Sequence, residues 1–421
     1  MYIVGEEEIE AIAEVIRSAK LFRYEIGQQC DRFERRYAEY LGVEHCALTA
    51  SGTYGLTAAL IGLGIGPGAE VLVPAHTYMA TATAVIATGA IPVIVDIDES
   101  ITIDPAAIDD AVGPHTRAVI PVHMWGTAAN MEAIMEVARR RELLVIEDAC
   151  QAVGGGYEGR RFGAIGHAGA FSFNYYKNMT AGEGGAVVTR DPVVAGRARC
   201  AIDPCHFYWK GRSEVLKPFA GIGARPSEIM AAMLNVQLDR IDGIVAAMRA
   251  ARDRILSGTH EFEALGLRPA PLHSPAHDCA AHVIFSLPSS DTARRFVDVF
   301  PSVIVGETGR HNYTEWDQVL MREGAPHPAL NPYNLPENAP CRRDYSKDMC
   351  ARSLEILGRT VMVPMDPRHT QQDVQDIVHN VGVAARVALG DLARTEVEIR
   401  NATPIDKQKF DIGSGETVQV P

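Results

Sequence analysis

The chain has 421 residues, of which 47% are hydrophobic and 22% charged, a composition typical of a globular protein with two or three domains. Its 40 Lys and Arg residues against 53 Asp and Glu residues give a net charge of −13, which disfavours nucleic acid and anionic membrane surfaces as partners. A chain of this length can bury a large core, so a small scaffold held together by disulfides is excluded.

Between residues 45 and 190, short apolar or β-branched runs alternate with helix-like stretches. This alternation predicts an α/β fold, a mostly parallel sheet flanked by helices. The runs are almost continuously apolar, which is typical of strands buried on both faces. The expected strands are 45–50, 70–74, 92–96, 117–122, 143–147, 168–173 and 186–189. The expected helices are 53–63, 79–88, 105–112 and 130–140.

After about residue 240 the pattern changes to a long helix followed by shorter elements, which predict a smaller α+β domain. These elements are a helix over 227–257, a strand at 282–288, a helix at 291–299, a strand at 360–364 and a helix at 371–389. Residues 307–345 are rich in Pro, Asn and Tyr and predict a long loop. We therefore expect a large domain over 1–240, a small domain over 241–390 and a polar tail over 391–421.

The eight cysteines are scattered without a C-x-x-C pair and are expected to be reduced thiols. Cys200, Cys205 and His206 come nearest to a metal cluster, but no second pair at zinc-finger spacing follows, so no metal is expected. The first residues are acidic and helical in period, unlike a signal peptide, and no apolar run is long enough to cross a membrane. We expect a cytoplasmic protein without a membrane partner.

Polar side chains follow several predicted strands directly, and in an open α/β sheet ligands bind at the carboxyl ends of the strands. Ser51, Gly52 and Thr53 follow the first strand and open a helix, whose free N–H groups suit a phosphate. The other residues expected at this edge are Tyr78, Asp148, Gln151, Ser172 and Lys177.

Together these residue types match the needs of pyridoxal 5'-phosphate. A lysine forms a Schiff base with it, a buried carboxylate keeps its pyridine nitrogen protonated, and an aromatic side chain stacks on its ring. Taken singly, each residue has an ordinary alternative: Asp148 can be a turn residue, Lys177 a surface lysine and Tyr78 part of the core.

Long runs of the chain resemble the DegT/StrS family of sugar aminotransferases, which share the type I fold of aspartate aminotransferase. The runs include IEDACQAVGG (146–155), AFSFNYYKNMTAGEGGAVVT (170–189), EVLVPAHTYMATATAV (70–85) and TVMVPM (360–365). The resemblance extends over most of the chain and implies a mostly parallel large domain that binds the cofactor and a smaller α+β domain.

The resemblance implies a role for each matching residue. Lys177 would hold pyridoxal 5'-phosphate and move the proton, and Asp148 would pair with its pyridine nitrogen. Gly52, Thr53 and Ser172 would bind the phosphate. Tyr78 would stack on the ring, and Gln151 would lie near the phenolic oxygen.

Two segments depart from the family pattern. Where relatives have an asparagine in a G-x-N-x-R-x-S run, this chain has Gly223, which offers no side chain to the neighbouring subunit, although Arg225 is retained. Segment 307–345 lacks the histidine-tyrosine-proline stretch of members that use nucleotide sugars. An unusual acceptor is therefore expected.

The resemblance implies an aminotransferase that moves an amino group from glutamate or glutamine to a keto-sugar or keto-cyclitol, as a homodimer with active sites at the interface. Three alternatives remain open. A dehydratase of the same fold would need a histidine at Lys177. A nicotinamide enzyme is favoured only by GGGYEG (154–159), which matches G-x-G-x-x-G but precedes no predicted helix. A noncatalytic sensory or regulatory protein is the third.

Overall fold

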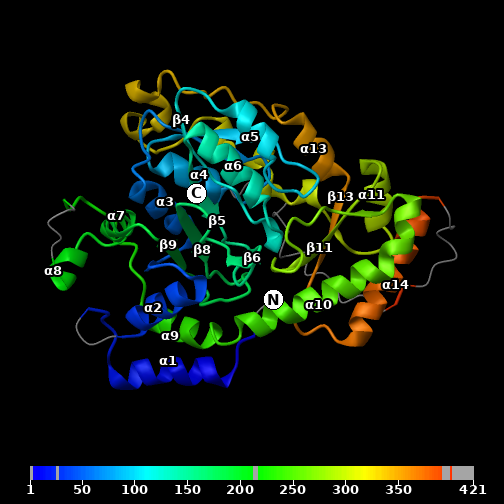
Figure 1. Cartoon of the computed structure of the whole chain (residues 1–421), viewed down its shortest axis with the longest axis horizontal. Coiled ribbons are helices and arrows are strands. Elements are labelled where there is room, and N and C mark those ends of the chain that lie inside the picture. The colour runs from blue at the N-terminus through cyan, green and yellow to red at the C-terminus, as the bar shows by residue number, and fades with distance from the viewer. Residues whose placement is uncertain (1–2, 25–27, 212–216, 391–398, 401–421) are drawn as a thin grey trace, which may run out of the picture.

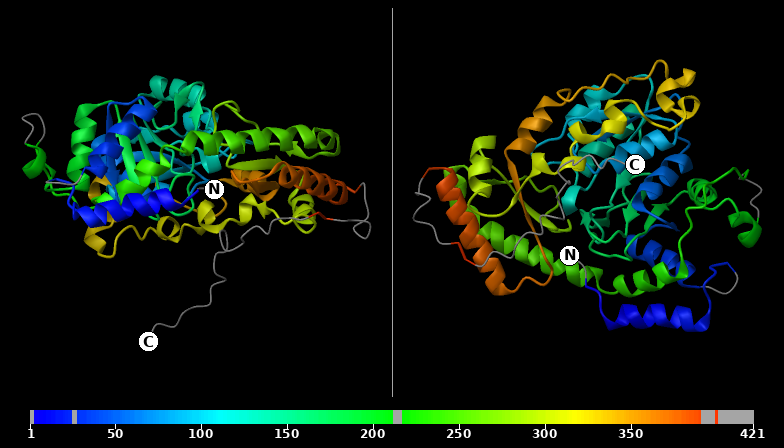
Figure 2. Two further views of the ribbon diagram at one scale, coloured as in Figure 1. Left: turned by 90° about the horizontal axis from the view of Figure 1, so that it is seen from below. Right: turned by 180° about the vertical axis from the view of Figure 1, so that it is seen from behind.

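The computed structural model describes residues 3–24, 28–211, 217–390 and 399–400. Most of the predicted C-terminal tail, 391–398 and 401–421, therefore lies outside the described residues. Figure 1 shows the chain with its elements labelled, and Figure 2 shows it from below and from behind.

The centre of the larger part is a sheet formed in the first half of the chain. Its strands are β1 (His45–Thr49), β2 (Glu70–Pro74), β3 (Ile91–Val95), β4 (Thr116–Val119), β5 (Leu144–Asp148), β8 (Ala168–Ser172) and β9 (Gly185–Thr189). Within the described residues their order is β1-β9-β8-β5-β4-β2-β3. In this sheet β9 runs in the direction opposite to that of the other strands, which are parallel to one another, so the mostly parallel sheet predicted from the sequence is confirmed.

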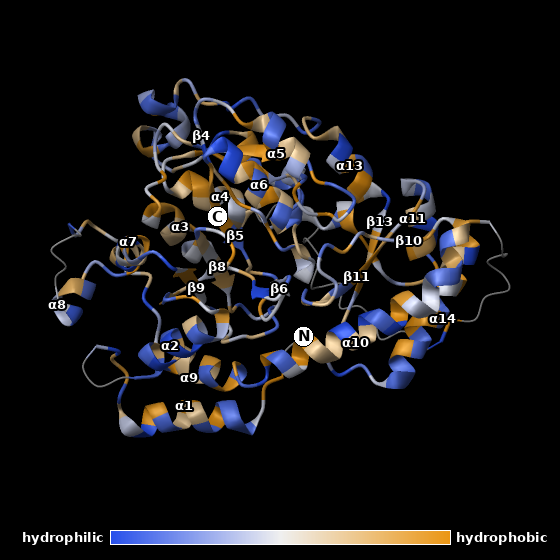
Figure 3. Cartoon of the chain, in the orientation of Figure 1, coloured by the Kyte–Doolittle hydropathy of each residue, from blue (hydrophilic) through white to orange (hydrophobic). Residues whose placement is uncertain are grey.

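Helices pack on both faces of this sheet. They include α3 (Gly52–Gly62), α4 (Ala80–Ala87), α5 (Pro105–Ala111), α6 (Met131–Arg141) and α7 (Pro192–Ile202). Side chains fix where several begin, because Ser51, Asp104 and Asp191 each accept a hydrogen bond from a first-turn N–H group. Figure 3 shows α4 mostly in the colours of hydrophobic residues, as expected of a helix that is largely buried.

The helices at the N-terminal end are α1 (Glu6–Ser18) and α2 (Gln29–Leu41), and both pack against α9 (Glu228–Gln237). The single helix predicted over 227–257 is wrong, because α9 ends at Gln237 and α10 (Ile241–Thr259) begins four residues later. Between the two helices, the Asp239 and Arg240 amides donate to carbonyl oxygens three residues earlier in the chain, and not four as in an α-helix. The Gln237 side chain is held there by Glu8 at 2.7 Å, so a tertiary contact fixes the break.

A second sheet lies at the other end of α10. Its strands are β10 (Arg268–Pro269), β11 (His282–Ser286), β12 (Val303–Ile304) and β13 (Thr360–Pro364), all antiparallel to their neighbours. The helices near it are α11 (Ser290–Val297), α13 (Ala351–Gly358) and α14 (Gln371–Ala388), and α10 extends along the molecule to pack on α14 (Figure 1).

One hydrophobic cluster joins the two sheets, since it includes Val145 of β5, Ile241 and Met248 of α10, and Val361 of β13. The α+β character predicted for the later part is confirmed, whereas the division of the chain at residue 240 stays a prediction. In the part of the chain that is described, no helix has the length and hydrophobicity needed to span a membrane.

Segment 307–345 is irregular, as predicted. It holds α12 (Asp317–Leu320) and short 3-10 turns, of which η4 (Gly309–His311) and η5 (Tyr313–Glu315) are hydrogen-bonded to the segment after β2. Tyr313 and Trp316 of this segment are fully buried in a core cluster with residues of β2 and α4. The segment is therefore packed onto the large sheet.

The loop that leads into β8 leaves no room for a side chain at Gly169, where a Cβ would lie 2.3 Å from Gly163 Cα. We expect Gly169→Ala to destabilise the protein by about 1–3 kcal/mol, the usual cost of overpacking a core. The measurement is the free energy of unfolding in urea.

Gly243→Ala is the matched control, because Gly243 lies on α10 with no atom within 4 Å of the position that a Cβ would take. This change should stabilise the protein slightly, by about 0.4–1 kcal/mol, by restricting the unfolded chain. Equal stability of the two variants would contradict the packing argument.

Candidate active site

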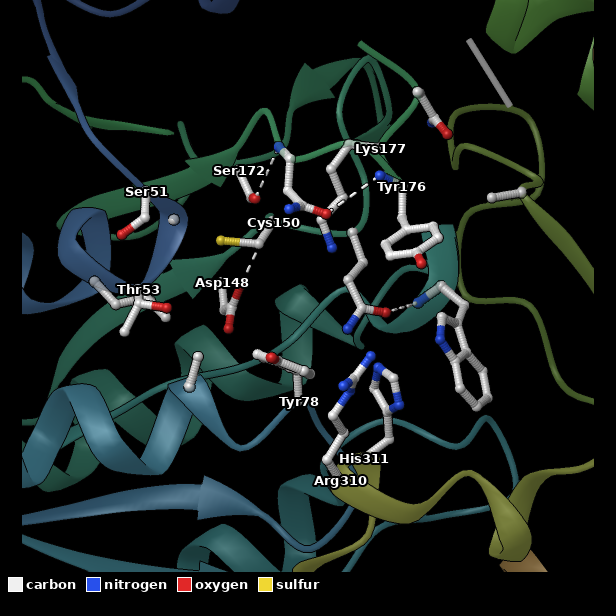
Figure 4. A pocket seen from close by; sticks show the side chains of 18 of the residues that line it. Ser51, Thr53, Tyr78, Asp148, Cys150, Ser172, Tyr176, Lys177, Arg310 and His311 are labelled. Atoms are coloured by element: carbon white, nitrogen blue, oxygen red, sulfur yellow. Dashed lines mark hydrogen bonds between the residues drawn. The ribbon is translucent and has the colours of Figure 1, made fainter. Parts of the chain in front are cut away.

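The carboxyl ends of β1, β5 and β8 border a cavity of about 340 Å³ (Figure 4), a size in the range of small-molecule sites. Every residue that the sequence predicts for the site lines this cavity: Gly52, Thr53, Tyr78, Asp148, Gln151, Ser172 and Lys177. These residues come from distant parts of the chain, so the fold brings the predicted set together.

The N-terminus of α3 forms one wall of the cavity. Ser51 caps the helix by accepting a hydrogen bond from the Tyr54 amide at 3.1 Å, which leaves the earlier amides of Gly52 and Thr53 without a helical partner. A Cβ at Gly52 would lie 2.6 Å from Ser172 Cβ and 2.9 Å from Cys150 Sγ. Only glycine therefore lets the helix end approach Ser172 this closely, and the result is a cradle of N–H groups and a hydroxyl.

Asp148 is the last residue of β5 and is nearly fully buried. Its Oδ2 accepts a hydrogen bond from Thr81 Oγ1 at 2.8 Å, and its Oδ1 accepts one from the Cys150 amide at 3.1 Å. Thr81 Oγ1 also lies 2.8 Å from Thr77 Oγ1, so two buried threonines from the segment after β2 fix the carboxylate in place. Both oxygens of this buried carboxylate therefore have a hydrogen-bond donor within the protein.

The preceding residue, Glu147, points away from the cavity and is completely buried. Its carboxylate accepts hydrogen bonds from the amides of Gly163, Ile165 and Gly166 at 2.6–2.9 Å. His123 Nε2 lies 3.1 Å from the same group, and the His123 amide donates to the Asp148 carbonyl oxygen. Glu147 thus ties the segments on either side of β5 to the strand end that carries Asp148.

Gln151 faces the cavity with a defined orientation. Its Oε1 accepts a hydrogen bond from the Trp125 amide at 3.3 Å, which leaves its NH₂ group free to donate to a ligand. Tyr78 also lines the cavity, is 38% exposed, and has its ring centroid 5.4 Å from that of His311. An aromatic ring and an amide donor therefore line the same cavity as Asp148, and Figure 4 shows the positions of Tyr78 and Asp148.

Lys177 lies in the loop after β8, where its amide donates to the Asn174 carbonyl oxygen at 3.0 Å. Burial lowers the pKa of the Lys177 ammonium below its ordinary value, and the charge of Arg310 lowers it further. The nearby Cys150 and Asp148 side chains raise the pKa and offset part of this shift. A lowered pKa increases the fraction of neutral amine, which is the nucleophilic form.

Several residues that line the cavity were not predicted from the sequence, among them Trp125, Arg310 and His311. Arg310 and His311 belong to the segment predicted only as a long loop, which is held to the loop after β2 by backbone bonds. The Thr77 amide donates to the His311 carbonyl oxygen and the Met79 amide to that of Arg310, both at 3.0 Å. In the sequence, the adjacent basic residues Arg310 and His311 within a segment rich in Pro, Asn and Tyr could have indicated a ligand contact.

Other predicted features lie elsewhere. Gly223 has a left-handed backbone, with φ of +79° and open space around its Cβ position, while Arg225 lines a small separate pocket with Arg23 and Arg199. Segment 154–159 forms a hairpin in which β6 (Gly156–Tyr157) pairs with β7 (Arg160–Arg161), so no helix follows as a dinucleotide site would require.

The cysteines are unpaired, as predicted. In the described ranges no group of three or more His, Cys, Asp and Glu side chains is arranged to hold a metal ion.

The donor set fits pyridoxal 5'-phosphate at three points. The cradle of Gly52, Thr53 and Ser172 offers N–H and O–H donors to a phosphate, and a Cβ at Gly52 would fill it. The Asp148 carboxylate can accept a hydrogen bond from a protonated ring nitrogen, and Lys177 supplies an amine in the same cavity. The individual roles predicted for these residues stay predictions.

Comparison with known proteins agrees with this picture. A model of the DegT/DnrJ/EryC1/StrS aminotransferase family matches residues 3–300. GDP-perosamine synthase of Caulobacter vibrioides is 40% identical over 236 residues, which are 55% of this chain and 61% of that protein. The dTDP-3-amino-3,4,6-trideoxy-alpha-D-glucose transaminase of Streptomyces venezuelae is 40% identical over 275 residues, which are 65% of this chain and 70% of that protein.

Among solved structures, an aminotransferase from Psychrobacter cryohalolentis superposes with a TM-score of 0.75 at 26% identity, covering 91% of this chain and 98% of that one. The type I fold implied by the resemblance is therefore confirmed.

Removing the Thr81 hydroxyl leaves a buried oxygen of Asp148 without its donor. We expect Thr81→Val, which keeps the side-chain shape, to lower the free energy of unfolding by about 1–3 kcal/mol. Thr81→Ser keeps the hydroxyl and should lie closer to the wild type. Urea unfolding of the protein without ligand measures both, and a Thr81→Val variant as stable as Thr81→Ser would rule out this role for the hydrogen bond.

Proposed function

Because the chain belongs to the DegT/DnrJ/EryC1/StrS aminotransferase family, we propose that it is a pyridoxal 5'-phosphate-dependent aminotransferase. It moves an amino group from glutamate or glutamine to a keto-sugar or keto-cyclitol. The observation that carries this proposal is the cavity in which the Lys177 amine, the Asp148 carboxylate and the N-terminus of α3 meet. The name of the relative from Streptomyces venezuelae, a transaminase of a dTDP-linked amino sugar, supports the class of acceptor.

When bound, the cofactor supplies an electron sink for the charge left when the donor loses its α-proton. Asp148, fixed by Thr81, would hold the proton on the ring nitrogen. The amides of Gly52 and Thr53 would bind its phosphate, and Tyr78, which also lines the cavity, would contact its ring. Lys177 would be the residue that accepts and returns the proton at its amine. This role needs the amine to be neutral for part of the cycle, and burial favours the neutral form.

Lys177 also decides between the candidate reactions. A dehydratase on this fold would place a histidine at this position, and the chain has a lysine there. The nicotinamide alternative is disfavoured by the hairpin at 154–159. A noncatalytic sensory protein can bind the same cofactor, so the turnover experiment below separates it from an aminotransferase.

The working form in this proposal is a homodimer in the cytoplasm, with each active site near the interface. Large apolar side chains are exposed on α8 (His206–Lys210) and in the nearby loop, where Tyr208 is 76% and Ile222 is 75% exposed. In this proposal these exposed apolar side chains contribute to the contact between the two subunits.

Sedimentation of the purified protein should give twice the mass of one chain. Ile222→Asp places a charge in the proposed contact and should shift the mass toward one chain. Met321→Asp, at a position 65% exposed elsewhere on the molecule, should not. A wild-type mass near one chain would contradict the dimer.

Lys177→Ala should reduce amino transfer from glutamate by at least about 10²–10⁴-fold, the usual contribution of a positioned proton carrier. The variant should also lose the visible absorption of lysine-bound cofactor while its unfolding temperature stays close to that of the wild type. Asp148→Asn is the comparison, because it should keep the absorption and still slow transfer. Unchanged turnover in Lys177→Ala would refute the proposed function, and a wild type that binds the cofactor without turnover would favour the sensory alternative.

A further inference from the structure

The cavity has a second half that the cofactor residues do not use. It is formed by Arg310 and His311, which Figure 4 shows side by side beneath Tyr78, with their side chains directed toward the middle of the cavity. Three backbone hydrogen bonds fix the pair, since the amides of Thr77 and Met79 donate to this segment and the Tyr313 amide donates to the Ala75 carbonyl oxygen at 3.0 Å.

Arg310 carries a positive charge that nothing in the described part of the chain neutralises. Its guanidinium lies 5.5 Å from the centroid of the Tyr78 ring, and no carboxylate among the described residues forms an ion pair with it. The other cation that lines the cavity, Lys177, lies near Asp148. Arg310 is therefore a cation at a ligand cavity that forms no ion pair within the described part of the chain.

His311 adds a neutral acceptor beside it. Its Nδ1 lies 3.3 Å from the Thr308 carbonyl oxygen, so Nδ1 carries the hydrogen and Nε2 keeps a lone pair. Burial lowers the pKa of His311 to about 3, so the ring is uncharged at neutral pH. The pair thus offers a planar cationic donor and an uncharged acceptor of the kind that a hydroxyl can donate to.

We infer that Arg310 is a specificity-determining residue that binds an oxyanion of the substrate, either the carboxylate of the amino donor or a phosphate on the keto acceptor. A guanidinium binds a carboxylate or a phosphate through two parallel hydrogen bonds. An oxyanion bound to Arg310 would lie near Tyr78 and close enough to Lys177 for their charges to interact. This inference rests on the proposed aminotransferase function, because it presumes that the substrates enter this cavity.

The electrostatic relation between the two cations agrees with this assignment. The charge of Arg310 lowers the pKa of Lys177, so an oxyanion bound to Arg310 removes part of that effect and makes the Lys177 amine more basic. Binding of the substrate group would then prepare Lys177 to accept a proton.

The test uses the cofactor-loaded protein and two unreactive probes, succinate for a carboxylate and inorganic phosphate for a phosphate. Their affinities are measured by calorimetry and by the change in the visible absorption of the cofactor. Arg310→Gln should weaken binding of at least one probe by about 10–100-fold, as expected when a charged hydrogen bond is lost. Arg310→Lys keeps the positive charge but lacks the paired N–H donors of the planar guanidinium, and it should recover part of that affinity.

Arg386→Gln is the matched control, because Arg386 also lies over an aromatic ring, 5.6 Å from the Phe262 centroid, outside the cavity. It should leave both affinities unchanged. A loss confined to succinate identifies the donor carboxylate, a loss confined to phosphate identifies a phosphorylated acceptor, and a loss of both identifies a general oxyanion site; each supports the inference.

Probe affinities within twofold in wild type and Arg310→Gln, including no binding by either, overturn the inference. A lower unfolding temperature of Arg310→Gln without a change in affinity also overturns it and assigns Arg310 to the support of Tyr78. These outcomes are distinct from failure of the proposed function, which appears as no amino transfer by the wild type and no effect of Lys177→Ala.

Discussion

The buried carboxylate of Glu147 is the constraint on which the rest of the site depends. A carboxylate taken completely out of water is stable only where donors surround it, and here three backbone amides and His123 do so. The amides belong to the segment that leads into β8, and His123 follows β4. Both segments are therefore bound to the end of β5, and the positions of Asp148 and Ser172 follow from this arrangement.

The cavity divides into two halves with different origins. The half that fits the cofactor is made by the ends of neighbouring strands in one sheet, from Gly52 to Lys177. The other half comes from residues more than a hundred positions later, which reach the cavity because a 3-10 turn is attached to the loop after β2. The residues proposed for the shared chemistry are thus located at the ends of the sheet strands, while the residue proposed to contact the individual substrate comes from an irregular segment.

This division explains what the sequence predicts well. The strand positions and the residues at their ends follow from local hydrophobicity and from the rule that ligands bind at carboxyl ends, so Asp148 and Lys177 were predictable. Arg310 was not, since the bonds that fix it join residues of two distant loops and leave no periodic pattern. The break between α9 and α10 was missed for the same reason, because Glu8 of α1 stabilises it.

The way in which the 308–313 segment is attached has a consequence for how such a protein changes over evolutionary time. The bonds from Thr77 and Met79 are to carbonyl oxygens, which every amino acid possesses. A substitution at position 310 therefore alters the group presented to the substrate without weakening the attachment that places it there. Substrate preference can diverge by single exchanges at this position while the catalytic half of the cavity is inherited unchanged, and the same position is a natural starting point for redesign.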